Sequence, residues 1–185
     1  MQYFSKFLAP QTADFNFTIE DPIESSDPAS IWTLNRGRHK TTKQPALIMT
    51  FIPGKTGTSV PNAQSLAENC AKRLKSMRHP DVLKFLDSAS ASDGTLYVAV
   101  EPCTPLPVHR KSHPVAPTDP AARDAALWGV LSISRALGFI HSSRIAHARV
   151  GANTVFVTPA GDWKLGAFEC AAKFDGSEEG GGANP

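Results

Sequence analysis

Short apolar runs separated by polar turns fill the first hundred residues. The pattern predicts strands over 30–40, 45–52, 82–90 and 95–101, and one helix over 63–77. The helix is the clearest element, because Leu66, Cys70, Leu74 and Met77 share one face and Pro80 follows its end. The segments 82–86 and 96–100 are expected to pair antiparallel. An earlier aromatic segment, 15–30, predicts a short strand and then a loop, so we expect a small sheet with one helix.

The second half of the chain begins with a proline-rich block. Six prolines lie between Pro102 and Pro120, which removes backbone donors and predicts a connection without regular helix or central strand. Beyond it, 121–143 reads as an amphipathic helix, with a stripe formed by Leu127, Leu131, Ser134, Leu137 and His141 and with Val130 beside it. Trp128, Leu131, Leu137 and Ile140 are expected to be buried against a following hairpin.

That hairpin is predicted from two apolar segments, 154–157 and 163–165, which flank the turn 159–162. A loop containing His147 precedes it, and this histidine is expected to bond backbone rather than to transfer protons. The last ten residues, 176–185, are rich in glycine and are predicted to be disordered.

Composition and charge limit the classes of function. The 185 residues carry a formal charge of +2, which gives little reason to expect electrostatic binding to nucleic acid or to an anionic membrane. The cysteines Cys70, Cys103 and Cys170 match neither a disulfide framework nor a metal motif, and His109 and His113 lack a third ligand. No long apolar run or signal peptide is present, so we expect a cytoplasmic chain without an integral membrane segment, metal or cofactor.

The order of these elements resembles the protein-kinase fold over 31–169. "KSMRHPDVLKFLD", "LYVAVEPC", "RIAHARVGANTVFV" and "WKLGAFE" carry the resemblance. It implies an α+β, protein kinase-like chain with a β-rich N-lobe containing one helix, a hinge and the beginning of an α-rich C-lobe. The expected divisions are an N-terminal extension (1–30), the N-lobe (31–100), the hinge and linker (101–120), a partial C-lobe (121–175) and the tail (176–185).

The same resemblance implies which catalytic groups have been replaced. Ser25, Asp27 and Ser30 occupy the region of the glycine-rich loop, where Asp27 would repel an anion. Met49 and Cys70 hold the positions of the phosphate-binding lysine and its glutamate. Arg149 holds the position of the catalytic base. Thr154 and Ala167 hold the positions of the metal-binding asparagine and aspartate. Glu68 lies two residues out of register, and no aspartate occurs between Arg144 and Gly161. We therefore expect no enzyme activity.

A vestigial nucleotide pocket is expected from the same alignment. Its lining is predicted to comprise Met49, Val100, Glu101, Cys103 and Phe168. Little would remain there to bind nucleotide beyond hinge contacts to adenine, although Arg149 could attract phosphate without metal.

Among kinase-like proteins the chain is most similar to the SCY-like, or N-terminal kinase-like, pseudokinases. The motifs that carry this match are "FNFTIEDPIE", "WTLNRGRHKTT", "AKRLKSMRHPDVLKFLD", "LYVAVEPCTPL" and "VFVTPAGDWKLGAFE". The resemblance implies a scaffold with protein partners, usually followed by HEAT repeats, in COPI-linked Golgi to endoplasmic reticulum traffic at Golgi membranes or in handling of exported tRNA. The chain stops after the degenerate metal loop, so we expect a fragment or a short product.

Two alternatives stay open. One is a divergent kinase with residual ATP binding or phosphotransfer. The other is an RNA-binding module for tRNA. It would use the basic hairpin formed by Arg36, Arg38, His39, Lys40 and Lys43, although a hairpin tip solvated by water explains these charges better.

Overall fold

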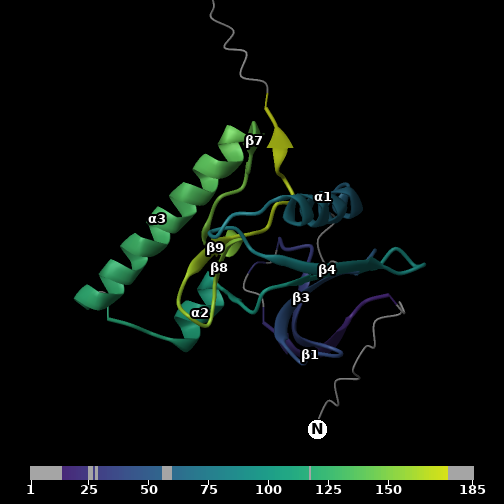
Figure 1. Cartoon of the computed structure of the whole chain (residues 1–185), viewed down its shortest axis with the longest axis horizontal. Helices are drawn as coiled ribbons and strands as arrows, with labels where there is room; N and C mark the ends of the chain where they lie inside the picture. The colour runs from purple at the N-terminus through teal and green to yellow at the C-terminus, as the bar shows by residue number, and fades with distance from the viewer. Residues whose placement is uncertain (1–13, 25–26, 28, 56–59, 117, 175–185) are drawn as a thin grey trace, which may run out of the picture.

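A five-stranded antiparallel sheet organises the N-terminal half of the chain (Figure 1). The computed structural model describes residues 14–24, 27, 29–55, 60–116 and 118–174, and the predicted tail lies outside them. The strands are β1 Phe17–Ile23, β2 Thr33–His39, β3 Pro45–Phe51, β4 Phe85–Ser90 and β5 Leu96–Val100. Their order is β1-β2-β3-β5-β4. Because β1 pairs with β2, the sheet begins before residue 31, the start that the sequence pattern predicted for the N-lobe.

The central strand β3 is buried on both faces, as its continuous apolar sequence requires. Leu47, Met49 and Phe51 point into the main core, whereas Ala46 and Ile48 point into a smaller cluster on the opposite face. The predicted pairing of 82–86 with 96–100 is confirmed only in part: β4 pairs with β5 from residue 85 onward, while Val82 forms a bridge with Leu165 of the C-terminal hairpin.

Helix α1, Ala63–Ser76, covers the main-core side of the sheet (Figure 1). Its buried residues are Ala67, Cys70 and Leu74, and Met77 is buried directly after it. The predicted helix face is confirmed in Cys70, Leu74 and Met77. The helix ends where Met77 adopts an extended conformation, three residues before Pro80.

The proline-rich connection contains a helix, so the prediction that it has none was wrong. Strand β6, Thr104–Pro105, leads into α2, Leu106–Ser112. Pro107 lies in the first turn, where a missing N–H costs no helical hydrogen bond, and six residues free of proline follow it. Proline therefore fixes where this helix begins instead of preventing it.

The long helix α3, Pro120–Ser142, forms as predicted but buries a different face. Its buried residues are Gly129, Ile133, Ala136 and Ile140. Ile140 was predicted correctly, whereas Trp128 and Leu131 are 65% and 44% exposed, which contradicts their predicted burial.

The physical reason for this difference lies at Gly129. A Cβ atom there would lie 2.1 Å from the Trp163 ring, so the helix can approach the hairpin only where glycine leaves room for the indole. The packed face therefore combines the small residues Gly129 and Ala136 with Ile133 and Ile140, whereas Trp128 and Leu131 lie outside it.

The remaining segments form two small sheets. Strand β7, Ile145–Ala146, pairs with β10, Ala172–Lys173. After the 3-10 turn η1, Ala152–Thr154, the predicted hairpin is confirmed as β8, Val155–Val157, and β9, Trp163–Leu165, with β6 beside β8. Gly161, at φ 90°, permits its tight turn. No described helix has the length and apolar character needed to cross a bilayer.

Candidate functional site

The cleft between the sheet and the C-terminal loops is almost completely filled. Its free volume is about 30 Å³, which is close to the share of one water molecule, whereas small-molecule sites usually offer about 300–1,000 Å³. The residues around it come from both halves of the chain: Asp27, Ser30, Trp32, Leu34, Met49, Pro105, Arg149, Asn153, Thr154, Phe156, Ala167 and Glu169. A nucleotide does not fit this cavity.

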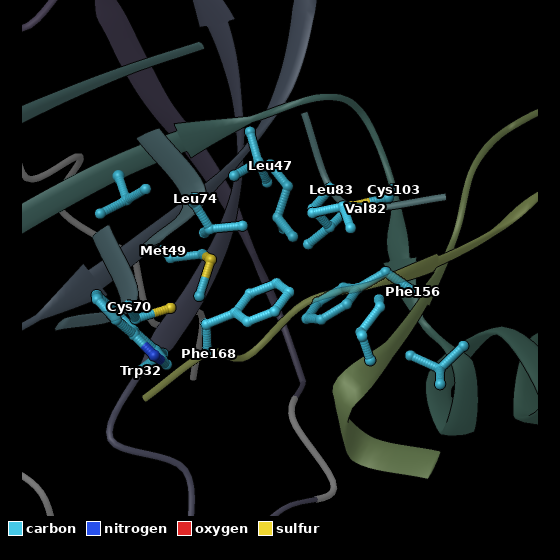
Figure 2. Close-up of a cluster of buried hydrophobic side chains, with 14 of the residues drawn as sticks. Trp32, Leu47, Met49, Cys70, Leu74, Val82, Leu83, Cys103, Phe156 and Phe168 are labelled. Atoms are coloured by element: carbon cyan, nitrogen blue, oxygen red, sulfur yellow. The ribbon is translucent and has the colours of Figure 1, made fainter. Parts of the chain in front are cut away.

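Apolar side chains occupy the centre of the region. Met49 from β3 and Cys70 from α1 are 1% and 0% exposed, and Figure 2 shows them in one cluster with Phe168. Burial raises the pKa of the Cys70 thiol, which therefore stays neutral. The two positions that the kinase resemblance assigns to a lysine–glutamate ion pair thus make an apolar contact.

Trp32, just before β2, closes the cleft from the sheet side. Its indole Nε1–H donates a 2.5 Å hydrogen bond to Oε1 of Glu169, and its ring packs edge-on against Phe51. Glu169 is 4% exposed, and its Oε2 has no hydrogen-bond partner among the described residues. Burial raises the pKa of Glu169, while the hydrogen bonds of the carboxylate and the Arg149 charge act in the opposite direction. The Trp32 indole is therefore the side-chain donor to a carboxylate held in the protein interior.

An ion pair joins the two sides of the cleft a second time. The Arg149 guanidinium lies 2.9 Å from Oδ2 of Asp27, although 122 residues separate them in sequence. Asp27 belongs to the loop between β1 and β2, and its side chain is 14% exposed. Because the Arg149 cation already has an anionic partner, it is not available as an unpaired phosphate-binding charge.

The remaining two altered positions, Thr154 and Ala167, offer no group for a metal ion. The Thr154 hydroxyl donates to the Gly151 carbonyl and accepts from the Gly151 N–H, at 2.9 and 3.0 Å. Ala167 has a methyl side chain and adopts a left-handed backbone at φ 58°. Neither supplies an anionic oxygen, and the described residues contain no group of three or more histidines, cysteines or acids that could hold a metal ion.

Comparison with curated proteins gives the chain its relatives. It is 24% identical over 164 residues to "Protein kinase domain-containing protein ppk3" of Schizosaccharomyces pombe, which covers 89% of this chain. It is 29% identical over 147 residues to "Probable inactive serine/threonine-protein kinase scy1" of Dictyostelium discoideum, covering 76% of this chain. The chain is a distant homologue of SCY1-like kinase-domain proteins.

A mouse protein is similar to this chain over a shorter stretch. The "Protein-associating with the carboxyl-terminal domain of ezrin" is 35% identical over 100 residues, or 54% of this chain. The chain spans between 12% and 24% of the length of these three relatives. No family model matches the sequence. The five-stranded sheet with α1 is consistent with the N-lobe of a kinase-like fold.

The five residues expected to line a vestigial nucleotide pocket have different surroundings in the described part of the chain. Met49 borders the narrow cleft, and Cys103 borders a different, wider one near the hinge. Val100 and Phe168 are fully buried, and the carboxylate of Glu101 accepts a hydrogen bond from the Lys84 N–H. The vestigial nucleotide pocket therefore stays a prediction, and the burial of Val100 and Phe168 leaves these two side chains little surface for a ligand to contact.

His147 is a buried structural histidine, as the sequence predicted. Its Nε2 lies 2.8 Å from the Gly166 carbonyl, and its Nδ1 accepts from the Arg149 N–H. This arrangement places the ring proton on Nε2, and burial lowers the pKa of the imidazole. A neutral ring with both nitrogens engaged fixes this loop to Gly166, directly after β9.

Two polar contacts that connect the N-terminal half of the chain to its C-terminal half were missed by sequence reasoning. The Asn69 amide on α1 donates to the carbonyls of Phe168, Glu169 and Ala171, at 2.8–3.3 Å. Asn69 stands beside Cys70 in the predicted helix, but one sequence does not show which carbonyls it would meet. It ties α1 to the segment that carries Glu169.

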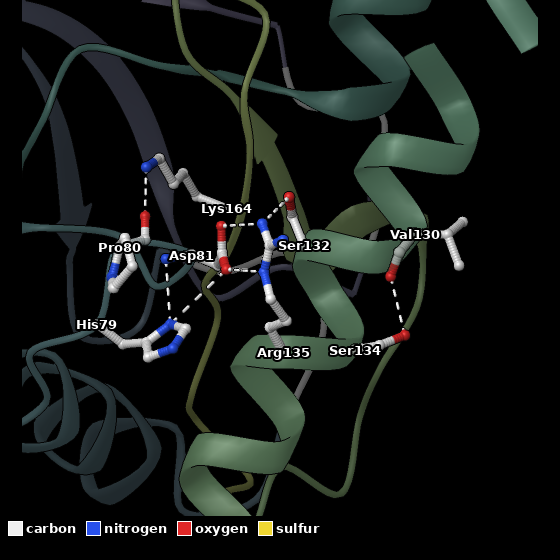
Figure 3. A network of polar contacts seen from close by, with 8 residues as sticks. All are labelled: His79, Pro80, Asp81, Val130, Ser132, Ser134, Arg135 and Lys164. Atoms are coloured by element: carbon white, nitrogen blue, oxygen red, sulfur yellow. Dashed lines mark hydrogen bonds and ion pairs between the residues drawn. The ribbon is translucent and has the colours of Figure 1, made fainter. Parts of the chain in front are cut away.

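The second contact is centred on Asp81 (Figure 3). Its carboxylate accepts from Nε and Nη2 of Arg135 on α3, at 2.9 and 3.3 Å, and Arg135 holds the pKa of this carboxyl below its usual value. Lys164 donates to the Pro80 carbonyl, and His79 stacks on Phe139 at 4.8 Å. The turn before β4 is therefore bonded to both α3 and β9.

The basic hairpin has a partly neutralised surface. Arg38 pairs with Glu20 at 3.3 Å, and the Lys43 ammonium donates to the Lys40 carbonyl. The His39 ring accepts from backbone N–H groups in the turn, where it stabilises the hairpin. These contacts account for much of the hairpin's polarity without a nucleic-acid ligand.

Proposed function

We propose that the chain is a kinase-like domain without phosphotransfer activity that acts as a protein-interaction scaffold. The observation that carries the proposal is the filled cleft, with about 30 Å³ of free volume beside the Trp32–Glu169 and Arg149–Asp27 contacts. Phosphoryl transfer depends on charges that position the phosphates and metal ions, so a site that lacks both space and free charges cannot perform it.

The altered positions support the same conclusion independently of the volume. Met49, Cys70, Arg149, Thr154 and Ala167 supply no lysine to hold phosphate, no base and no carboxylate for Mg²⁺. Opening the cleft would free Arg149 but would also expose Asp27 and Glu169, whose negative charges oppose binding of ATP. A divergent kinase is therefore the weaker proposal.

The relatives support a role through protein partners. One is named a probable inactive kinase, and the mouse relative is named for association with the carboxyl-terminal domain of ezrin. A more specific role in COPI-linked traffic at Golgi membranes or in tRNA handling rests on the resemblance to SCY-like pseudokinases. The matched relatives are much longer proteins, and this chain spans at most 24% of their length.

A thermal-shift experiment tests the absence of nucleotide binding. A ligand at 100 times its dissociation constant adds about 2.7 kcal/mol, which raises the midpoint of a domain of this size by roughly 5 °C. We expect millimolar Mg-ATP to give the whole chain no stabilisation that a chelator abolishes, and phosphate transfer to a generic substrate at the level of a buffer control. A shift that a chelator abolishes, or transfer above that control, would favour the divergent kinase.

A further inference from the structure

A second cleft lies on the hinge side of the molecule, separate from the filled cavity. Its volume is about 590 Å³, within the range of about 300–1,000 Å³ typical of small-molecule sites. It is bounded by the strands β1, β2 and β3, the hinge residues 102–104, helix α2 and the hairpin turn 158–161. The proposed scaffold function assigns no role to this space.

Two arginines stand on the sheet wall of the cleft. Arg36 and Arg38 are two residues apart on β2, so their side chains emerge on the same face of the strand. Arg38 is engaged by Glu20, the only carboxylate among the described residues that line the cleft. Arg36 makes no hydrogen bond or ion pair with any residue that the structure describes. One guanidinium is therefore free to accept an anion, and a second lies beside it.

Two histidines from α2 and its end form part of the opposite wall. The rings of His109 and His113 stack with centroids 4.5 Å apart and planes 17° apart. His113 Nδ1 lies 3.2 Å from the His109 carbonyl, so its position is fixed by the helix. Burial and the neighbouring His113 lower the pKa of His109, so this ring is neutral and can donate one N–H at neutral pH. The wall offers polar, planar groups without negative charge.

We propose that this hinge cleft binds a small phosphate ester, with Arg36 as the principal phosphate ligand and the histidine pair against the organic part. A guanidinium matches two phosphate oxygens with its paired N–H donors. A single phosphate would leave most of about 590 Å³ empty, so the volume favours an organic group attached to it. The filled cavity beside Trp32 takes no part in this binding.

The experiment is an NMR titration of the whole chain with phenyl phosphate, and with benzyl alcohol as the uncharged comparison. Saturable shifts are expected at the Arg36 Nε–H and the His109 ring for phenyl phosphate alone. Arg36→Gln should weaken binding by about fivefold or more, because it removes a charge-assisted contact. Arg123→Gln removes the same charge from an exposed position on α3 outside the cleft and should change affinity by less than about twofold.

Several results would overturn this assignment. Equal affinity for benzyl alcohol would show that the contact is apolar, and equal loss in the two variants would show that only net charge matters. Shifts that do not saturate would exclude a defined site. Binding of an oligoribonucleotide without binding of phenyl phosphate would assign the arginines to a nucleic-acid surface instead. Circular dichroism of both variants confirms that any loss does not come from unfolding.

Discussion

Replacing Trp32 by phenylalanine tests the contact that closes the cleft. The change keeps an aromatic ring beside Phe51 but removes the indole N–H that bonds Glu169. Because Oε2 of Glu169 already lacks a partner among the described residues, the variant leaves the carboxylate without its side-chain donor. We expect Trp32→Phe to lower the free energy of unfolding.

The magnitude and pH dependence follow from the burial of Glu169. A hydrogen bond to a charged group contributes about 1.5–3 kcal/mol, and the smaller ring loses about 1 kcal/mol of apolar burial. Because its pKa is raised, Glu169 keeps its proton to higher pH in the folded protein than in the unfolded chain. The free energy of unfolding therefore falls as pH rises from the ordinary carboxyl pKa through the raised pKa of Glu169. Removing the donor raises the pKa further and deepens that fall.

Urea unfolding followed by circular dichroism measures both effects. We expect a loss of about 2.5–4 kcal/mol at about pH 7.5, and a loss about 1 kcal/mol smaller at about pH 4.5, where more of the carboxyl is protonated. Trp128→Phe is the matched control, since this side chain is 65% exposed and should change stability by less than about 0.5 kcal/mol. Equal stability of Trp32→Phe and the natural chain, or the same loss at both pH values, would refute the reasoning.

Two further substitutions test the packing of α3 and its bond to the N-terminal half. Gly129→Ala should cost about 1–3 kcal/mol in urea unfolding because its Cβ would overlap the Trp163 ring, whereas Gly138→Ala, which meets nothing within 4 Å, should gain about 0.5–1 kcal/mol. Similar effects of the two changes would contradict the proposed packing. Asp81→Asn should cost about 1–2 kcal/mol at neutral pH by weakening the bond to Arg135. Since Arg135 lowers the pKa of Asp81, the pair stabilises the fold above the ordinary carboxyl pKa and loses this effect as acidification protonates Asp81, so a deficit that persists unchanged in acid would exclude this explanation.

The sequence predicted elements well where large apolar side chains define the packed face. Helix α1 follows this rule, because Cys70 and Leu74 repeat at helical spacing on the buried side. Helix α3 does not, because its contact with Trp163 requires glycine, which hydrophobic periodicity does not mark. Leu127 and Leu131 of the predicted apolar stripe are therefore exposed, and so is Trp128, which was predicted to be buried.

The candidate site was predictable in its residues but not in its contacts. The kinase resemblance placed Asp27 and Arg149 near one cleft, yet it gave no reason to expect a 2.9 Å ion pair between them. Trp32 was assigned only to a strand, and its bond to Glu169 depends on two loops that approach after 136 intervening residues. Such contacts depend on how the loops pack, which local sequence patterns do not encode.

The indole N–H signals of the three tryptophans give the most direct test of the closed cleft. Hydrogen exchange should be slow for Trp32, which is buried and bonded to Glu169, and fast for the exposed Trp128. Millimolar Mg-ATP should leave the Trp32 signal and its exchange rate unchanged. Rapid exchange of Trp32, or a saturable movement of its signal with Mg-ATP, would contradict the account by showing that the cleft opens and admits nucleotide.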